Sequence, residues 1–111
     1  LKNASNLLGM QDNNFDSFHE FYRYYLSQHL KSKTKIFHFI GTALVIFNLI
    51  LFCIYLHFIY FLLIPISGYG FAWFSHFFFE KNNPATFKYP LYSFQADFLM
   101  FWHIIIGKVK I

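Results

Sequence analysis

Residues 36–79 read IFHFIGTALVIFNLILFCIYLHFIYFLLIPISGYGFAWFSHFFF, a run of 44 residues without Asp, Glu, Lys or Arg. At about 1.5 Å per helical residue the run would form roughly 66 Å of helix, which fits two crossings of a hydrocarbon core about 30 Å thick. The other 67 residues are too few to bury two such helices inside a soluble domain. The run therefore predicts an all-α integral membrane protein built on a two-span transmembrane hairpin.

Basic residues flank both ends of this run. Three lysines between positions 31 and 35 precede the first span, expected at about 36–56, and Lys81 and Lys88 follow the second, expected at about 58–80. Because cytoplasmic loops carry an excess of Lys and Arg, we expect both flanks and both termini to be cytoplasmic. The membrane would be the bacterial inner membrane, or the endoplasmic reticulum in a eukaryote.

The position of the chain reversal is less clearly marked than the run itself. No Gly or Pro stands near position 57, where the hairpin should turn. Helix-breaking residues gather instead at Pro65, Gly68 and Gly70. This cluster leaves open an alternative in which one long helix is followed by a short helix that begins near Phe71.

The segments outside the run predict two peripheral helices. Apolar residues between positions 15 and 30 recur at three- and four-residue spacing, which indicates an amphipathic helix, and Ser17 with Glu20 can form a capping box at its start. Leu91 to Ile106 is too short for a comfortable span and contains an aspartate, so we expect an interfacial or re-entrant helix. Residues 1–14 form a polar N-terminal tail, and residues 15–111 form a single membrane-embedded domain.

Composition argues against a nucleic-acid-binding protein and against an internal disulfide. Nine basic against five acidic residues could suggest nucleic-acid binding, but the lysines stand at the ends of apolar segments, where they read as membrane anchors. Cys53 is the single cysteine and cannot form an internal disulfide. We therefore expect the lipid bilayer, and no nucleic acid, as a partner.

Histidines provide the candidate chemistry. His38 lies just inside the first span and His76 just before the end of the second, so an antiparallel hairpin brings the two to similar depth. His29, on the apolar stripe of the preceding helix, can approach them from the side. Imidazole groups gathered in this way are typical metal ligands. The other histidines, His19, His57 and His103, are expected not to be ligands.

Two acidic residues extend this candidate site. Glu80 follows His76 by four residues, so on an α-helix both would share a face and could aim at one metal ion. Asp97 stands in an otherwise apolar segment, where a carboxylate is costly unless it is paired or used. It could orient a ligand histidine by accepting a hydrogen bond from it. The predicted site is therefore His29, His38 and His76 around a metal, with Glu80 and Asp97 as its carboxylates.

The segment 66–100, ISGYGFAWFSHFFFEKNNPATFKYPLYSFQADFLM, resembles the family of 2-hydroxy fatty acid dioxygenases, which act in metabolism of phytosphingosine to odd-numbered fatty acids. Upstream, YYLSQH ending at His29 and FHFIGT around His38 are similar to the two N-terminal histidine motifs of the family. The resemblance covers about residues 15–107. The family pattern is matched in the longer segment by Gly68 to Gly70, Ala72, Trp73, His76, Glu80, Asn83 and Pro84 to Phe87.

This resemblance implies a non-haem Fe(II) dioxygenase of fatty-acid α-oxidation. Its substrates would be O2 and a long-chain 2-hydroxy fatty acid, which it would convert to the acid one carbon shorter. The apolar tail would lie in the bilayer, between helices, or along aromatic walls such as Phe77, Phe78 and Phe79. The residues alone leave a second interpretation open, a non-catalytic and metal-free membrane protein that binds lipid or supports an assembly.

Overall fold

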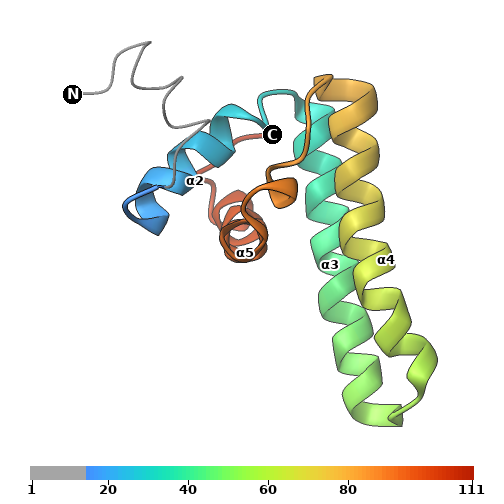
Figure 1. Ribbon diagram of the computed structural model, residues 1–111. Helices are drawn as coiled ribbons and strands as arrows, with labels where there is room; N and C mark the ends of the chain where they lie inside the picture. Colours follow the sequence, from blue (N-terminus) through green and yellow to red (C-terminus); the bar gives the residue numbers. More distant parts are fainter. Residues whose placement is uncertain (1–14) are drawn as a thin grey trace.

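A computed structural model describes residues 15–111, and the predicted polar tail at 1–14 lies outside these described residues. Two long helices, α3 (Ser32–Tyr55) and α4 (Phe58–Ser75), run antiparallel and side by side (Figure 1). A π-helical turn, η1 (His76–Glu80), continues α4. No strand occurs among the described residues, which confirms the predicted all-α class.

The remaining elements form a second group, which we call the head. It consists of α2 (Phe18–Ser27), the short 3-10 turn η2 (Ala85–Phe87) and α5 (Pro90–Ile105), and it lies beside one half of the hairpin (Figure 1). Ser17 caps α2 as expected, because its Oγ accepts a hydrogen bond from the Glu20 backbone N–H at 3.3 Å.

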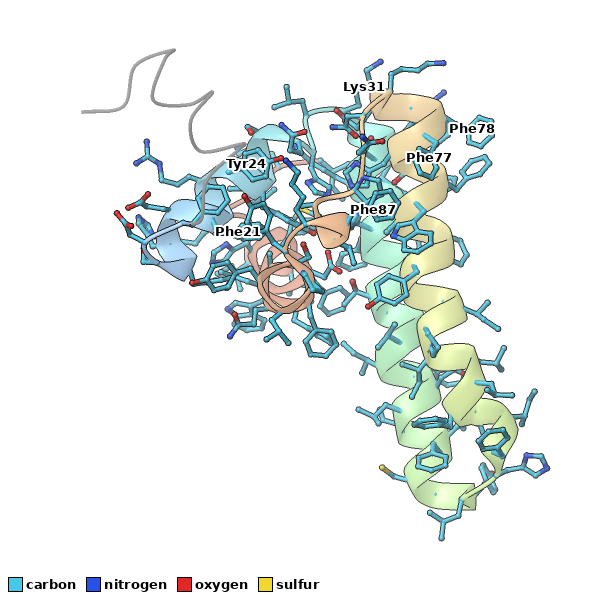
Figure 2. The ribbon with its side chains drawn as sticks, viewed as in Figure 1. Phe21, Tyr24, Lys31, Phe77, Phe78 and Phe87 are labelled. Atoms are coloured by element: carbon cyan, nitrogen blue, oxygen red, sulfur yellow. The ribbon has the colours of Figure 1, made fainter. Side chains whose placement is uncertain are left out.

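The main hydrophobic core lies in the head and not between the long helices. Figure 2 shows Phe21 inside this group, between α2 and α5. Aromatic side chains of α2 pack there against small and flexible residues of α5, so that the interface closes without large gaps. The buried members of the core are Phe15, Phe21, Tyr22, Tyr25, Ala85, Ala96 and Met100.

Helix α5 crosses the hairpin and does not extend it. In Figure 1 it is seen nearly end-on, whereas α3 and α4 lie along the plane of the picture. Its bounds, Pro90–Ile105, are close to the predicted 91–106, and Pro90 begins it at a position where the missing N–H costs nothing. With 16 residues, α5 is shorter than a typical bilayer-spanning helix, and its interfacial or re-entrant position stays a prediction.

The chain reverses near position 57, so the alternative of one long helix with a break before Phe71 is wrong. Helix α4 continues through Pro65, Gly68 and Gly70. Leu56 makes the turn in a left-handed conformation, with φ of 54°, and the His57 Nδ1 accepts a hydrogen bond from the Ile59 N–H at 3.1 Å. The sequence carries no Gly or Pro signal because a leucine occupies this position, at a cost of roughly 1 kcal/mol or more in backbone conformation.

Small residues let α3 and α4 approach closely. A Cβ atom added at Gly41 would lie 3.0 Å from the backbone oxygen of Ser67 and 3.1 Å from the Cβ of Phe71. Two turns further along α3, the Asn48 side-chain amide donates to the Ser67 Oγ at 3.3 Å. Close packing and hydrogen bonds of this kind are what hold helices together where lipid removes the hydrophobic driving force.

Replacing Gly41 by Ala is therefore expected to destabilise the hairpin. Overpacking costs about 1 to 3 kcal/mol, and the gain in helix propensity, about 1 kcal/mol, offsets only part of that cost. Gly70→Ala is the matched control, because no atom lies within 4 Å of its added Cβ. Thermal unfolding in detergent should show a lower midpoint for Gly41→Ala alone, and equal midpoints for both variants would contradict the close approach.

The outer surfaces of the hairpin are apolar. Helix α3, and α4 together with η1, are both long and apolar enough to cross a membrane. Most of their large apolar side chains are exposed, among them Phe47, Ile54, Phe58 and Ile66, each with about half or more of its surface accessible. The hairpin therefore differs from the core helices of a soluble protein, which bury such side chains.

Candidate metal centre

His29 follows the end of α2 and is completely buried. Its Nδ1 lies 2.6 Å from the backbone oxygen of Tyr25. A carbonyl oxygen only accepts hydrogen bonds, so Nδ1 carries the proton and donates it, which leaves a free lone pair on Nε2. Burial, followed by the neighbouring His38 and His76, holds the pKa of His29 well below its ordinary value. The side chain is therefore a neutral imidazole.

His76 begins the π-helical turn and is held in the same tautomer by Asn82. The Asn82 amide nitrogen donates to the backbone oxygen of Gln28 at 3.2 Å, which fixes the orientation of the amide. Its Oδ1 therefore faces the His76 Nδ1, at 2.7 Å, and accepts the proton of that nitrogen. The lone pair of the His76 Nε2 is left free.

His38 lies in the second turn of α3, with an exposed fraction of only 5%. Its Nδ1 is 3.4 Å from the Asp97 Oδ1 and 3.4 Å from the Tyr25 hydroxyl oxygen. Both oxygens face the proton-bearing side of the imidazole. The Tyr25 hydroxyl itself donates a short hydrogen bond to Asp97.

The three Nε2 atoms meet at one point between α2, α3 and η1. The Nε2 of His29 is 3.1 Å from that of His38 and 3.0 Å from that of His76, and the three ligand atoms all lie within 4.8 Å of one another. Nitrogens that bind one metal at about 2.1 Å and at right angles are about 3 Å apart. Three lone pairs that converge without a proton between them repel each other, and a cation among them removes that repulsion. The residues therefore fit a metal ion.

Asp97 is placed as a supporting carboxylate of this centre. Burial raises its pKa to about 6, although the hydrogen bond from Tyr25 and the nearby histidines lower it. The pKa of Tyr25 is raised well above its ordinary value, first by burial and then by Asp97, so this hydroxyl keeps its proton. An oxygen acceptor behind each imidazole is the usual arrangement around metal-bound histidines.

Glu80 does not join the group of ligand atoms. Its Oε2 accepts hydrogen bonds from the Lys31 backbone N–H at 2.6 Å and from the Thr34 hydroxyl at 2.8 Å. The expectation that Glu80 and His76 would aim at one metal assumed α-helical geometry. The segment is a π-helix instead, in which positions four apart are no longer related as on an α-helix, and the carboxylate reaches the start of α3.

The remaining histidines lie outside the cluster. His57 caps the start of α4, at the turn of the hairpin, and His19 is exposed on α2. The His103 Nδ1 is 2.8 Å from the Tyr22 hydroxyl, and His103 does not belong to the group of converging nitrogens.

Sequence reasoning missed two residues that hold the ligand histidines in place. Tyr25 lies within the apolar pattern of residues 15–30 and precedes His29 by four residues, so the spacing alone could have placed both on one face of the helix. Asn82 follows the end of the second predicted span, and no signal in the sequence pairs it with His76.

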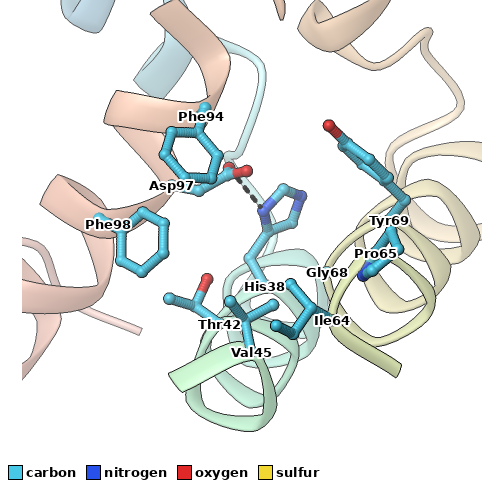
Figure 3. Close-up of a pocket in the computed structure, with 10 residues that line it drawn as sticks. All are labelled: His38, Thr42, Val45, Ile64, Pro65, Gly68, Tyr69, Phe94, Asp97 and Phe98. Atoms are coloured by element: carbon cyan, nitrogen blue, oxygen red, sulfur yellow. Dashed lines mark ion pairs between the residues drawn. The ribbon is translucent and has the colours of Figure 1, made fainter. Parts of the chain in front are cut away.

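A cavity of about 130 Å³ adjoins the histidine cluster. Figure 3 shows the His38 imidazole and the Asp97 carboxylate facing the space between α3, α4 and α5, beside the rings of Phe94 and Phe98. The rest of the wall is mostly apolar. Its lining residues are His38, Thr42, Val45, Ile64, Pro65, Gly68, Tyr69, Phe94, Asp97 and Phe98.

Comparison with known proteins gives one match. Residues 15–109 match the sequence model of a family described as 2-hydroxy-palmitic acid dioxygenase Mpo1-like. The match covers every helix of the described residues, from α2 to α5. No curated protein and no solved structure matches the chain.

Proposed function

The chain belongs to the 2-hydroxy-palmitic acid dioxygenase Mpo1-like family, and from this we propose that it is an Fe(II)-dependent dioxygenase of fatty-acid α-oxidation. Its substrate would be a long-chain 2-hydroxy fatty acid, and its product the acid one carbon shorter. The observation that supports this proposal most strongly is the convergence of three buried Nε2 atoms, from His29, His38 and His76.

The proposed reaction balances with one molecule of dioxygen. A 2-hydroxy acid and O2 contain the atoms of the shortened acid, carbon dioxide and water, with the bond between C1 and C2 broken and dioxygen reduced. Iron held by the three histidines would supply the redox chemistry with dioxygen, which neutral imidazole ligands suit.

The side chains around the histidines would keep the centre in shape. The Tyr25 carbonyl, Asp97 and Asn82 each face an Nδ1 and fix one imidazole. Asp97 would in this way orient His38, and Glu80 would hold the π-helical turn against the start of α3. Burial of all three histidines keeps bulk water from the reacting atoms.

The membrane would supply the substrate. The apolar outer surfaces of α3 and α4 support insertion of the hairpin into a bilayer, and the histidine cluster lies at the end that carries the lysine flanks. In this topology the hydroxy-acid head group reaches the metal at the cytoplasmic interface, while the tail stays in an apolar environment.

The topology is tested by reporter fusions at positions 32 and 85, which flank the two helices. We expect both positions to report the cytoplasmic side, because both lie among the lysines that flank the two helices. A fusion at position 57 serves as the control and should report the opposite side. Opposite sides for positions 32 and 85 would exclude the hairpin topology.

The function is tested by turnover of 2-hydroxypalmitic acid with the purified, iron-loaded protein. We expect consumption of O2 with formation of the acid one carbon shorter, and loss of both in the presence of a chelator. Palmitic acid is the matched control and should not react, because it lacks the hydroxyl at C2. Conversion without dioxygen at the aerobic rate would contradict the dioxygenase, whereas no conversion of either acid by the iron-treated protein would favour the metal-free lipid-binding protein.

A further inference from the structure

The cavity beside His38 extends along the hairpin away from the metal centre. On α3 its wall is formed by His38, Thr42 and Val45, which follow one face of the helix. These positions span seven residues, or about 10 Å along the helix axis. On the facing helix, Ile64 and Gly68 accompany them.

The two ends of the cavity differ in chemistry. His38 and Asp97 make one end polar, whereas Val45, Ile64 and Phe98 are apolar. A long-chain 2-hydroxy acid has the same division, with two oxygen-bearing carbons followed by methylene groups. The head group therefore matches the polar end of the cavity beside the metal centre, and the first part of the tail matches the apolar end.

The volume limits how much of the tail fits. About 130 Å³ is close to the roughly 150 Å³ of an engineered apolar cavity that holds benzene, a molecule of six carbons. The cavity can therefore take about six methylene groups, and a sixteen-carbon acid is longer than the cavity by about half its length.

We propose that this cavity is the acyl subsite of the enzyme and that it contacts only about the first six carbons beyond the hydroxy-acid head. The remainder of the chain lies in lipid along the outside of the hairpin. This inference rests on the proposed function, because it takes the 2-hydroxy acid as the ligand.

The aromatic residues near the end of α4 are not this subsite. Phe78 is mostly exposed and points away from the head (Figure 2), and Phe79 packs edge-on against Phe37 at 5.1 Å between ring centroids. Phe77, Phe78 and Phe79 do not line the cavity. The wall of the cavity is therefore formed by residues of α3, α4 and α5, and not by the three rings named from the sequence.

The subsite predicts how affinity depends on chain length. Each methylene buried in an apolar site contributes about 0.8 kcal/mol, or about fourfold in affinity. We expect affinity to rise about fourfold per carbon up to eight carbons in total, and much less steeply beyond that.

The test is anaerobic equilibrium binding of radiolabelled 2-hydroxypalmitic acid to the iron-loaded protein in one detergent. Val45→Phe should weaken binding at least tenfold, because the larger ring has to enter the cavity. It cannot turn toward α4 instead, since the Val45 Cγ2 is already only 3.1 Å from the position of a Cβ added at Gly68. Ile50→Phe is the matched control, on an exposed part of the same helix, and should bind normally. Iron content reports whether each variant is folded.

A second variant protects the test against a folding defect. Ile64→Ala enlarges the cavity and should move the start of the plateau in affinity one to two carbons further along the chain. Equal binding by Val45→Phe and Ile50→Phe, with turnover intact, would overturn the acyl subsite and leave the proposed function standing. Weaker binding by Val45→Phe without turnover in any variant would support the subsite and overturn the dioxygenase. No binding by the unmodified protein would overturn the subsite.

Discussion

His76→Ala is expected to remove nearly all bound iron from the purified protein and to abolish turnover. The two remaining histidines would offer two Nε2 atoms in place of three. Because the site is buried, a water molecule from bulk solvent cannot take the place of the lost imidazole ligand. Iron per chain, measured by elemental analysis, should fall from about one to the background of a chelated sample.

The control for this prediction is His57→Ala. This histidine caps α4 at the turn of the hairpin, so its loss should leave iron content unchanged. His29→Ala and His38→Ala should both behave as His76→Ala does. If His57→Ala lowers iron as much as His76→Ala, the assignment of the three ligands is wrong.

Glu80→Ala is expected to lower stability while iron binding is retained. The carboxylate accepts hydrogen bonds from the Lys31 N–H and from Thr34, whose side chain is fully buried. Hydrogen bonds to a charged group contribute about 1.5 to 3 kcal/mol each, so we expect a loss of about 2 to 4 kcal/mol after discounting the exposed Lys31 contact. Chemical unfolding in detergent measures this loss.

Glu80→Gln is the matched variant, because its amide oxygen can still accept both hydrogen bonds. It should recover much of the stability that Glu80→Ala loses. Should Glu80→Ala lose iron without losing stability, the carboxylate would be a metal ligand after all, as its spacing from His76 on an α-helix suggested.

The sequence was sufficient to predict two long apolar helices that run antiparallel, because the 44-residue run without charge is long enough for two helices and has lysines at both ends. It also predicted that His38 and His76 would meet, since the depth of each in an antiparallel pair follows from its distance to the lysine flanks. In the structure both lie within 3.1 Å of the His29 Nε2. These predictions needed only residue counting along regular helices.

What the sequence could not predict depends on departures from regular helices. The π-helical turn at His76 redirects Glu80 toward Thr34, and the spacing of four residues gives no sign of it. Lys81 adopts a left-handed conformation with φ of 63° between the π-helical turn and Asn82, whose Oδ1 contacts the His76 Nδ1. Leu56 likewise turns the chain where a glycine would be expected. Local backbone geometry of this kind is set by tertiary contacts and not by residue preference.

The order of the three histidines along the chain has a consequence for biosynthesis. His29 is synthesised before the first long helix, and His76 only at the end of the second. In the proposed membrane topology, a chain in which only the first long helix has been inserted has two of the three ligands at most, and these cannot yet hold a metal ion in the final geometry. For the proposed iron centre, binding of the metal would thus mark a chain in which both long helices and the three ligand histidines are in place.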